Sequence, residues 1–120
     1  MSKSIGLILA ALMLLTAATS GAQAVEWGSI YYSPSTHATG FSHNYDTQRQ
    51  AERAAASYCR GGDCEYAISF RNACGAVAVG RNGGWGADWG TTGNSAQSNA
   101  VNACRSHDRG CSVVRWQCSK

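Results

Sequence analysis

Leucine is missing from the chain after residue 24, although the residues before that point hold five leucines. A small domain without leucine must fill its interior with other large side chains, and the aromatic residues are the ones available. We therefore expect Phe41, Tyr45, Trp85 and Trp89 to form much of the core.

Long apolar runs are scarce as well. Only residues 5–18 form one, and no later segment approaches the 18 apolar residues of a membrane span. This run follows Lys3 and precedes Ala22-Gln23-Ala24, a pattern typical of a secretory signal peptide cleaved after Ala24. No cysteine follows the run, which argues against a lipid anchor. We expect residues 25–120 to form one domain, secreted or periplasmic.

Charge of either sign is sparse. Without residues 1–24, nine Lys and Arg residues face seven Asp and Glu residues, a net charge near +2. The basic residues form no cluster of four or five, so the sequence lacks the footprint of a nucleic-acid-binding protein or of an anionic membrane patch. The expected partner is a protein or another component of the cell envelope.

Cysteine, in contrast, is well represented in the predicted mature chain, with residues at positions 59, 64, 74, 104, 111 and 118. An even number of cysteines in an exported chain indicates three disulfides. The alternative is a zinc site that includes His107, but the spacings C-x4-C and C-x6-C fit no common zinc motif. We expect no metal and no cofactor.

The chain repeats itself after about 45 residues. "WGSIYYS" parallels "CGAVAVG", "GFSHNY" parallels "GWGADW", "TQRQAERAAASYC" parallels "GNSAQSNAVNAC", and "CEYAISF" parallels "CSVVRWQ". Each copy reads as strand, strand, helix, strand. The prediction is an α+β domain of two tandem ββαβ units, residues 27–73 and 74–120, with six strands, two helices and a pseudo-two-fold axis.

Local signals place the turns and the helix starts. Thr47 with Gln50 fits a capping box, and Asn94 or Ser95 is the expected cap of the second helix. Asn82-Gly83 predicts a type I′ hairpin turn within the glycine-rich segment 74–90. That segment has no Gly-Lys-Ser/Thr or G-x-G-x-x-G motif, and a strand separates its turn from the next helix, so a phosphate loop is excluded.

The repeat also predicts how the cysteines pair. Cys59 and Cys104 end the two helices, and Cys64 and Cys111 begin the strands that follow. Equivalent bridges Cys59–Cys64 and Cys104–Cys111 leave Cys74 to pair with Cys118.

Several blocks of the sequence resemble a bacterial exported family, the domain-of-unknown-function family 4189. They are Trp27-Gly28-Ser29-Ile30, the alanine-rich helix ending in Cys59, the segment "NACGAVAV" from Asn72, and the closing Trp116-Gln117-Cys118. The resemblance runs from Trp27 to Cys118. It implies one exported fold and carries no established chemistry.

We favour a non-enzymatic interaction module that binds through Tyr31, Arg71 and Asn72. Tyr31 lies on the strand face opposite Ile30, where we expect it to be exposed. The sequence assigns no catalytic residue.

One alternative is a small secreted hydrolase that uses His43 and Asp88. Another is a secreted inhibitor or immunity protein with the loop 33–39 as its bait. His37 and His107 read as turn residues.

Overall fold

The structure is a computed structural model that describes residues 24–120. The predicted signal peptide lies outside the described residues except for Ala24, so its cleavage stays a prediction. The elements are β1 (Trp27–Tyr32), β2 (Thr39–Tyr45), α2 (Gln48–Tyr58), β3 (Glu65–Arg71), β4 (Ala73–Val79), β5 (Trp85–Gly90), α3 (Gly93–Arg105) and β6 (Ser112–Ser119).

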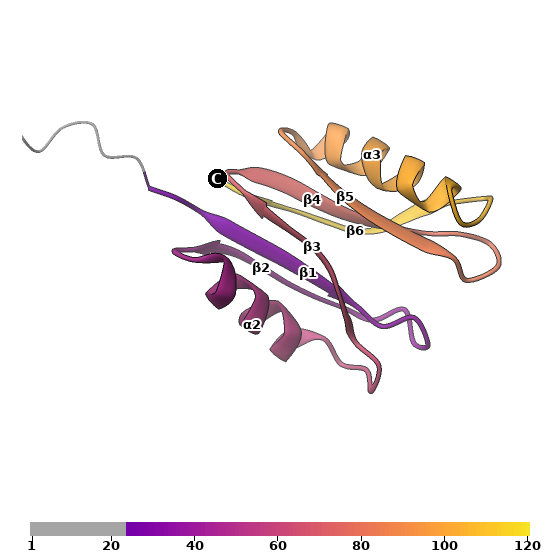
Figure 1. The fold of residues 1–120 in the computed structure, drawn as a ribbon, viewed down its shortest axis with the longest axis horizontal. Coiled ribbons are helices and arrows are strands. Elements are labelled where there is room, and N and C mark those ends of the chain that lie inside the picture. The colour runs from indigo at the N-terminus through magenta and orange to yellow at the C-terminus, as the bar shows by residue number, and fades with distance from the viewer. Residues whose placement is uncertain (1–23) are drawn as a thin grey trace, which may run out of the picture.

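The two halves of the chain are built in the same way (Figure 1). Each makes a three-stranded antiparallel sheet, with β1 between β2 and β3 in one and β4 between β5 and β6 in the other. Even an irregularity repeats, because β3 skips Ala67 in its pairing with β1 and β6 skips Val114 in its pairing with β4. The predicted α+β fold of two ββαβ units is confirmed.

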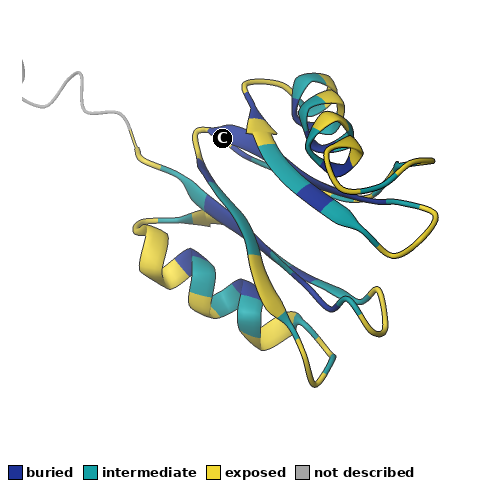
Figure 2. Cartoon of the chain, turned by 45° about the vertical axis from the view of Figure 1, so that its right-hand side comes forward, coloured by how far each residue is buried: buried dark blue, intermediate teal, exposed yellow. Residues whose placement is uncertain are grey.

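The two sheets pack face to face, and each helix covers the outer face of its own sheet (Figure 1). Between the sheets lies a core that includes Ile30, Tyr32, Phe70 and Val77. A second cluster joins β4 to α3 through small side chains and cystine sulfur. Strand β4, the middle strand of its sheet, is buried along its whole length (Figure 2).

The three predicted disulfides are the ones present: Cys59–Cys64, Cys74–Cys118 and Cys104–Cys111. None of the described cysteines is free, so no thiolate is available for zinc. Two bridges join a helix end to the following strand. The third joins directly opposed residues of β4 and β6.

The second strands of the two hairpins, β2 and β5, do not correspond in the structure as the sequence alignment of the two copies predicts. Tyr31 pairs with Gly40, and Ala78 pairs with Gly86, so Gly40 corresponds to Gly86 and not to Gly84. Both glycines lie against the last turn of a helix, where a Cβ atom would collide with helix backbone. The alignment of "GFSHNY" with "GWGADW" is therefore wrong by two residues, because register and helix contact decide the correspondence.

The hairpin turn at residues 80–84 also differs from the prediction. A type I′ turn needs positive φ at both central residues, but of Asn82 and Gly83 only Gly83 has it, at 89°. The Gly83 amide donates to the Gly80 carbonyl at 3.2 Å, and the Gly80 amide donates to the Gly84 carbonyl at 2.7 Å. This is a type I turn followed by a left-handed glycine, the usual three-residue hairpin loop.

The two helices begin at equivalent threonines. Thr47 caps α2, and its hydroxyl accepts a hydrogen bond from the Gln50 amide at 3.2 Å, which is one of the two hydrogen bonds of the predicted capping box. The cap of α3 is Thr92, so the prediction of Asn94 or Ser95 is wrong. Ser95 completes the capping box instead, because its hydroxyl accepts from the Thr92 amide at 3.1 Å.

The aromatic core is smaller than predicted. Trp85 packs against the core, with its ring 5.1 Å from that of Tyr32, and Phe41 packs there too. Trp89 is 50% exposed, so its assignment to the core is wrong. It lies near the end of β5, which is an edge strand, and alanine and valine of β4 fill the interior instead.

Candidate functional site

An open groove brings together side chains from both units. It has a volume of about 340 Å³ and is lined by Trp27, Ser69, Phe70, Arg71 and Trp89. Trp27 begins β1 and Arg71 ends β3, and the two are direct cross-strand partners. Trp89 comes from β5 of the second unit. We call this site the Arg71 groove.

The groove combines one positive charge with two large rings. The Arg71 guanidinium carbon lies 6.0 Å from the centroid of the Trp27 ring, within the range of a cation–π contact. Arg71 is exposed, and half of the Trp89 side chain is exposed. Tryptophan and arginine dominate the energetically important residues of protein interfaces. Arg71 therefore lies in a setting that suits a partner.

Asn72, in the connector between β3 and β4, positions two residues of the groove through hydrogen bonds to the segment before β1. Its side-chain oxygen accepts a hydrogen bond from the Glu26 amide at 2.8 Å, and its own amide donates to the Glu26 carbonyl at 2.9 Å. Its φ of 49° is unusual for a residue other than glycine. These contacts fix the start of β1 beside the end of β3, which keeps Trp27 next to Arg71.

Tyr31 is not the exposed ring that the sequence predicts. It is half-buried and meets Tyr66 edge-on, with 5.9 Å between ring centroids. Burial raises the pKa of Tyr31, and the nearby Glu52 carboxylate adds to the rise. The prediction failed because the face opposite the sheet interface is covered by α2. Tyr66, with 46% of its surface exposed, is the accessible ring of this pair.

The two residues of the hydrolase alternative do not meet. His43 lies on β2 and Asp88 on β5, which are edge strands of different sheets. Strand β2 packs over β6, whereas β5 packs under β3, so the two side chains occupy opposite edges of the sandwich. Asp88 accepts a hydrogen bond from the Trp89 amide at 2.8 Å. This arrangement offers no acid–base pair between them.

The other two histidines lie in turns, as the sequence indicates. His37 has a φ of 65° and stacks on Tyr32, with 6.2 Å between ring centroids. His107 is exposed, and its amide donates to the Cys104 carbonyl at 2.9 Å just after α3.

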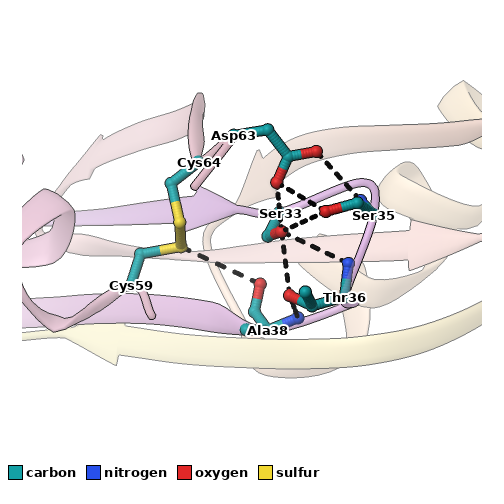
Figure 3. Close-up of a disulfide and its surroundings, with 7 residues drawn as sticks. All are labelled: Ser33, Ser35, Thr36, Ala38, Cys59, Asp63 and Cys64. Carbon is teal, nitrogen blue, oxygen red and sulfur yellow. Dashed lines mark hydrogen bonds between the residues drawn. A yellow bond between two sulfur atoms is a disulfide. The ribbon is translucent and has the colours of Figure 1, made fainter. Parts of the chain in front are cut away.

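An aspartate organises the first hairpin turn (Figure 3). Asp63 lies next to Cys64 in the loop closed by the Cys59–Cys64 bridge. Its carboxylate accepts hydrogen bonds from the Ser33 hydroxyl, from the Ser35 hydroxyl at 2.9 Å and from the Ser35 amide at 3.1 Å. The disulfide loop therefore holds the hairpin turn in place.

Asp108 does the same in the second unit. It lies within the Cys104–Cys111 loop and accepts hydrogen bonds from the Asn82 amide at 2.8 Å and the Gly84 amide at 2.9 Å. Neither aspartate was predicted from the sequence, although the occurrence of one aspartate inside each cysteine loop is a signal that points to them.

Hydrogen bonds stabilise both carboxylates in the charged form. The Ser33 hydroxyl is the main cause that lowers the pKa of Asp63, followed by the hydroxyl and amide of Ser35. The pKa of Asp108 is lowered by the Arg109 amide first and by the hairpin amides after it. A carboxylate with a lowered pKa is a weak base, so these groups serve the structure of the turns.

Among residues 24–120, no three His, Cys, Asp or Glu side chains are grouped so that they could hold a metal ion. No helix in the described part of the chain is long and apolar enough to cross a membrane.

These features define a small, disulfide-crosslinked α+β domain made of two ββαβ units. The chain belongs to the family described as a domain of unknown function, DUF4189, whose model matches residues 27–118. The resemblance inferred from the sequence is thereby confirmed.

Among solved structures, the chain is similar to Rv1813c from Mycobacterium tuberculosis, which was determined by NMR. The TM-score is 0.60 and the sequence identity 29%, over 83% of this chain and 80% of that one. No curated protein sequence matches the chain.

Proposed function

We propose that the protein is an exported, non-enzymatic binding module that takes a protein or cell-envelope partner at the Arg71 groove. The observation that carries the proposal is the meeting of Trp27 and Arg71 of one unit with the half-exposed Trp89 of the other. Contiguous exposed apolar surface, unlike single scattered residues, often marks a site where another molecule binds.

Two further observations support this function. Three disulfides fit an oxidising compartment outside the cytoplasm, where a signal peptide would deliver the chain. The separation of His43 from Asp88 removes the acid–base pair that the hydrolase alternative requires.

A comparative pull-down tests the proposal. The oxidised wild-type protein and the Arg71→Ala, Trp89→Ala and Arg60→Ala variants are immobilised and exposed to cell-envelope and culture-supernatant fractions. Arg60 is an exposed arginine in the loop after α2 and serves as the matched control. We expect the same partner to be recovered with the wild type and Arg60→Ala and to be at least about tenfold depleted with the other two variants. Equal recovery with Arg71→Ala and Trp89→Ala would contradict the proposal.

One observation favours the inhibitor as a second candidate. The loop 33–39 is held rigid by Asp63, while Ser35, Thr36 and His37 are exposed on it. A rigid exposed loop loses little conformational entropy when it enters the site of another protein. Inhibition of secreted proteases by the wild type but not by Thr36→Ala would support this role, and full protease activity at stoichiometric excess would exclude it.

A further inference from the structure

Besides the Arg71 groove, another groove lies along β2 and has a structural counterpart in the other unit. The groove along β2, which we call the β2 groove, has a volume of about 450 Å³ and is lined by Thr39, Phe41, Ser42, His43, Tyr45 and Tyr58. The counterpart of about 510 Å³ is lined by Ala67, Gly84, Trp85, Gly86, Ala87, Ala103 and His107. Each lies between the second strand of its unit and the last turn of its helix.

The counterpart shows which side chains the fold itself requires. The strand register matches Phe41 to Ala87, and the helix ends at Cys59 and Cys104 match Tyr58 to Ala103. The second unit thus folds with alanine where the first carries a tyrosine. Tyr58 is 60% exposed, so its ring contributes little to the core.

A bulge distinguishes the β2 groove further. Between Ser42 and Tyr45, β2 has one residue more than the facing part of β1, whereas β5 pairs with β4 without a break. Asn44 takes a φ of 63° in this bulge, and its amide donates to the Ser119 hydroxyl at 2.8 Å. Bulges occur often beside binding sites, because they redirect a side chain. Here His43 and Asn44 together occupy the place that Trp89 alone holds in the second unit.

The lining combines rings with neutral polar groups. The six residues that line the groove include no Asp, Glu, Lys or Arg. The nearby Arg115 is already engaged, since its guanidinium covers the Phe41 ring at 4.3 Å and donates to the Thr39 hydroxyl at 3.1 Å. Tyr45 and Tyr58 therefore provide the rings that remain available to a ligand.

We propose that the β2 groove binds a neutral oligosaccharide. A pyranose ring presents polarised C–H groups on its face, which the negative face of an aromatic ring attracts, and hydroxyl groups around its rim. Tyr58 and Tyr45 supply the stacking surface, and His43 and Thr39 supply polar groups for the rim. This binding is independent of the Arg71 groove and goes beyond the function proposed above.

NMR titration of the oxidised, isotope-labelled protein locates the site. The probes are chitotetraose, cellotetraose and maltotetraose at millimolar concentration, with a tetra-alanine peptide as the comparison. We expect at least one sugar to shift the amide signals of residues 39–45 and Tyr58 and to leave residues 84–87 and Ala103 unchanged. Three silent sugars, shifts confined to the second unit, or the same shifts with the peptide would each overturn the proposal.

Substitutions then test the role of the ring. Tyr58→Ala should weaken sugar binding about tenfold, and Tyr58→Phe, which keeps the ring, should stay within about threefold of the wild type. Tyr66→Ala removes an exposed tyrosine outside the groove and should bind as the wild type does. Because Ala103 occupies the equivalent position, Tyr58→Ala should keep its fold. Unchanged affinity in Tyr58→Ala would contradict the proposal.

Discussion

The two units differ most at one cross-strand pair that occupies the same backbone position in both. At one equivalent cross-strand position the second unit holds Cys74 opposite Cys118 and joins them in a disulfide, whereas the first unit holds Trp27 opposite Arg71. The disulfide locks a strand that is wholly buried. The Trp27–Arg71 pair instead borders an open groove. One position thus serves stability in one unit and, in our account, binding in the other.

The contacts beneath the two helices differ in a similar way. In the first unit the Ser69 hydroxyl donates to Glu52 of α2 at 2.8 Å and lies 3.2 Å from the Ser29 hydroxyl. In the second unit Trp116 occupies the place of Ser69 and packs so closely on α3 that Gly93 has no room for a Cβ. The first unit is therefore more polar and the second more closely packed.

The largest contrast should appear when the disulfides are removed one at a time. Cys74–Cys118 closes a separation of 44 residues, and Cys59–Cys64 closes one of 5. Chain entropy predicts a loss of about 4 kcal/mol for the first bridge and about 2 kcal/mol for the second. Urea unfolding of the paired Cys→Ala variants measures both. Equal losses would show that the bridge in the second unit has no special weight.

Substitution of two tryptophans tests which of them belongs to the core. Trp85 packs on Tyr32 in the core, so Trp85→Ala should lower the free energy of unfolding by about 3 kcal/mol through lost burial and a cavity. Trp89 is half-exposed, and Trp89→Ala should cost only about 1 kcal/mol. Chemical denaturation compares the two. A larger loss of unfolding free energy for Trp89→Ala than for Trp85→Ala would show that Trp89 is a core residue and would argue against its role in binding.

Asn72 tests the connector between the units. Asn72→Ala removes the hydrogen bond from the Glu26 amide and places alanine at a φ of 49°, which should cost about 1 kcal/mol or slightly more. Asn72→Gly removes the same bond without backbone strain and should retain more stability than Asn72→Ala. Identical thermal midpoints for the two variants would show that backbone strain plays no part.

The smallest expected effect concerns the two aspartates and pH. Both have a pKa below the usual value, so their contribution to stability is complete above the unfolded-state pKa. That contribution is lost as the pH falls through the lower pKa of the folded state. Thermal melts between about pH 2 and pH 6 should therefore show a smaller pH dependence in Asp63→Asn and in Asp108→Asn than in the wild type. An unchanged pH profile in both variants would contradict the structural role of these carboxylates.

The sequence was most informative where the repeat constrained it. The order of elements and the cysteine pairs follow from matching Cys59 to Cys104 and Cys64 to Cys111, because a repeated fold repeats its crosslinks. Sequence alignment of the two copies failed in the second strands, β2 and β5. There the correspondence of residues depends on the length of the preceding loop and on a bulge at Asn44 that no local sequence pattern indicates.

The candidate sites were harder to predict than the fold. Arg71 was predicted only as a candidate partner-binding residue, and Trp27 and Trp89 join it in one groove because the sheets pack face to face. Tyr31 was misplaced because strand alternation separates two faces without showing that a helix covers one of them. Asp63 and Asp108 were missed because their partners lie in turns distant in sequence.

The central claim is that the position held by Trp27 and Arg71 is open because it binds a partner. Trp27→Cys combined with Arg71→Cys gives the first unit the crosslink of the second, and peptide mapping verifies that these two positions are bridged. Our account predicts a folded protein whose partner recovery in the pull-down falls at least about tenfold. Undiminished recovery with the new bridge in place would contradict the account.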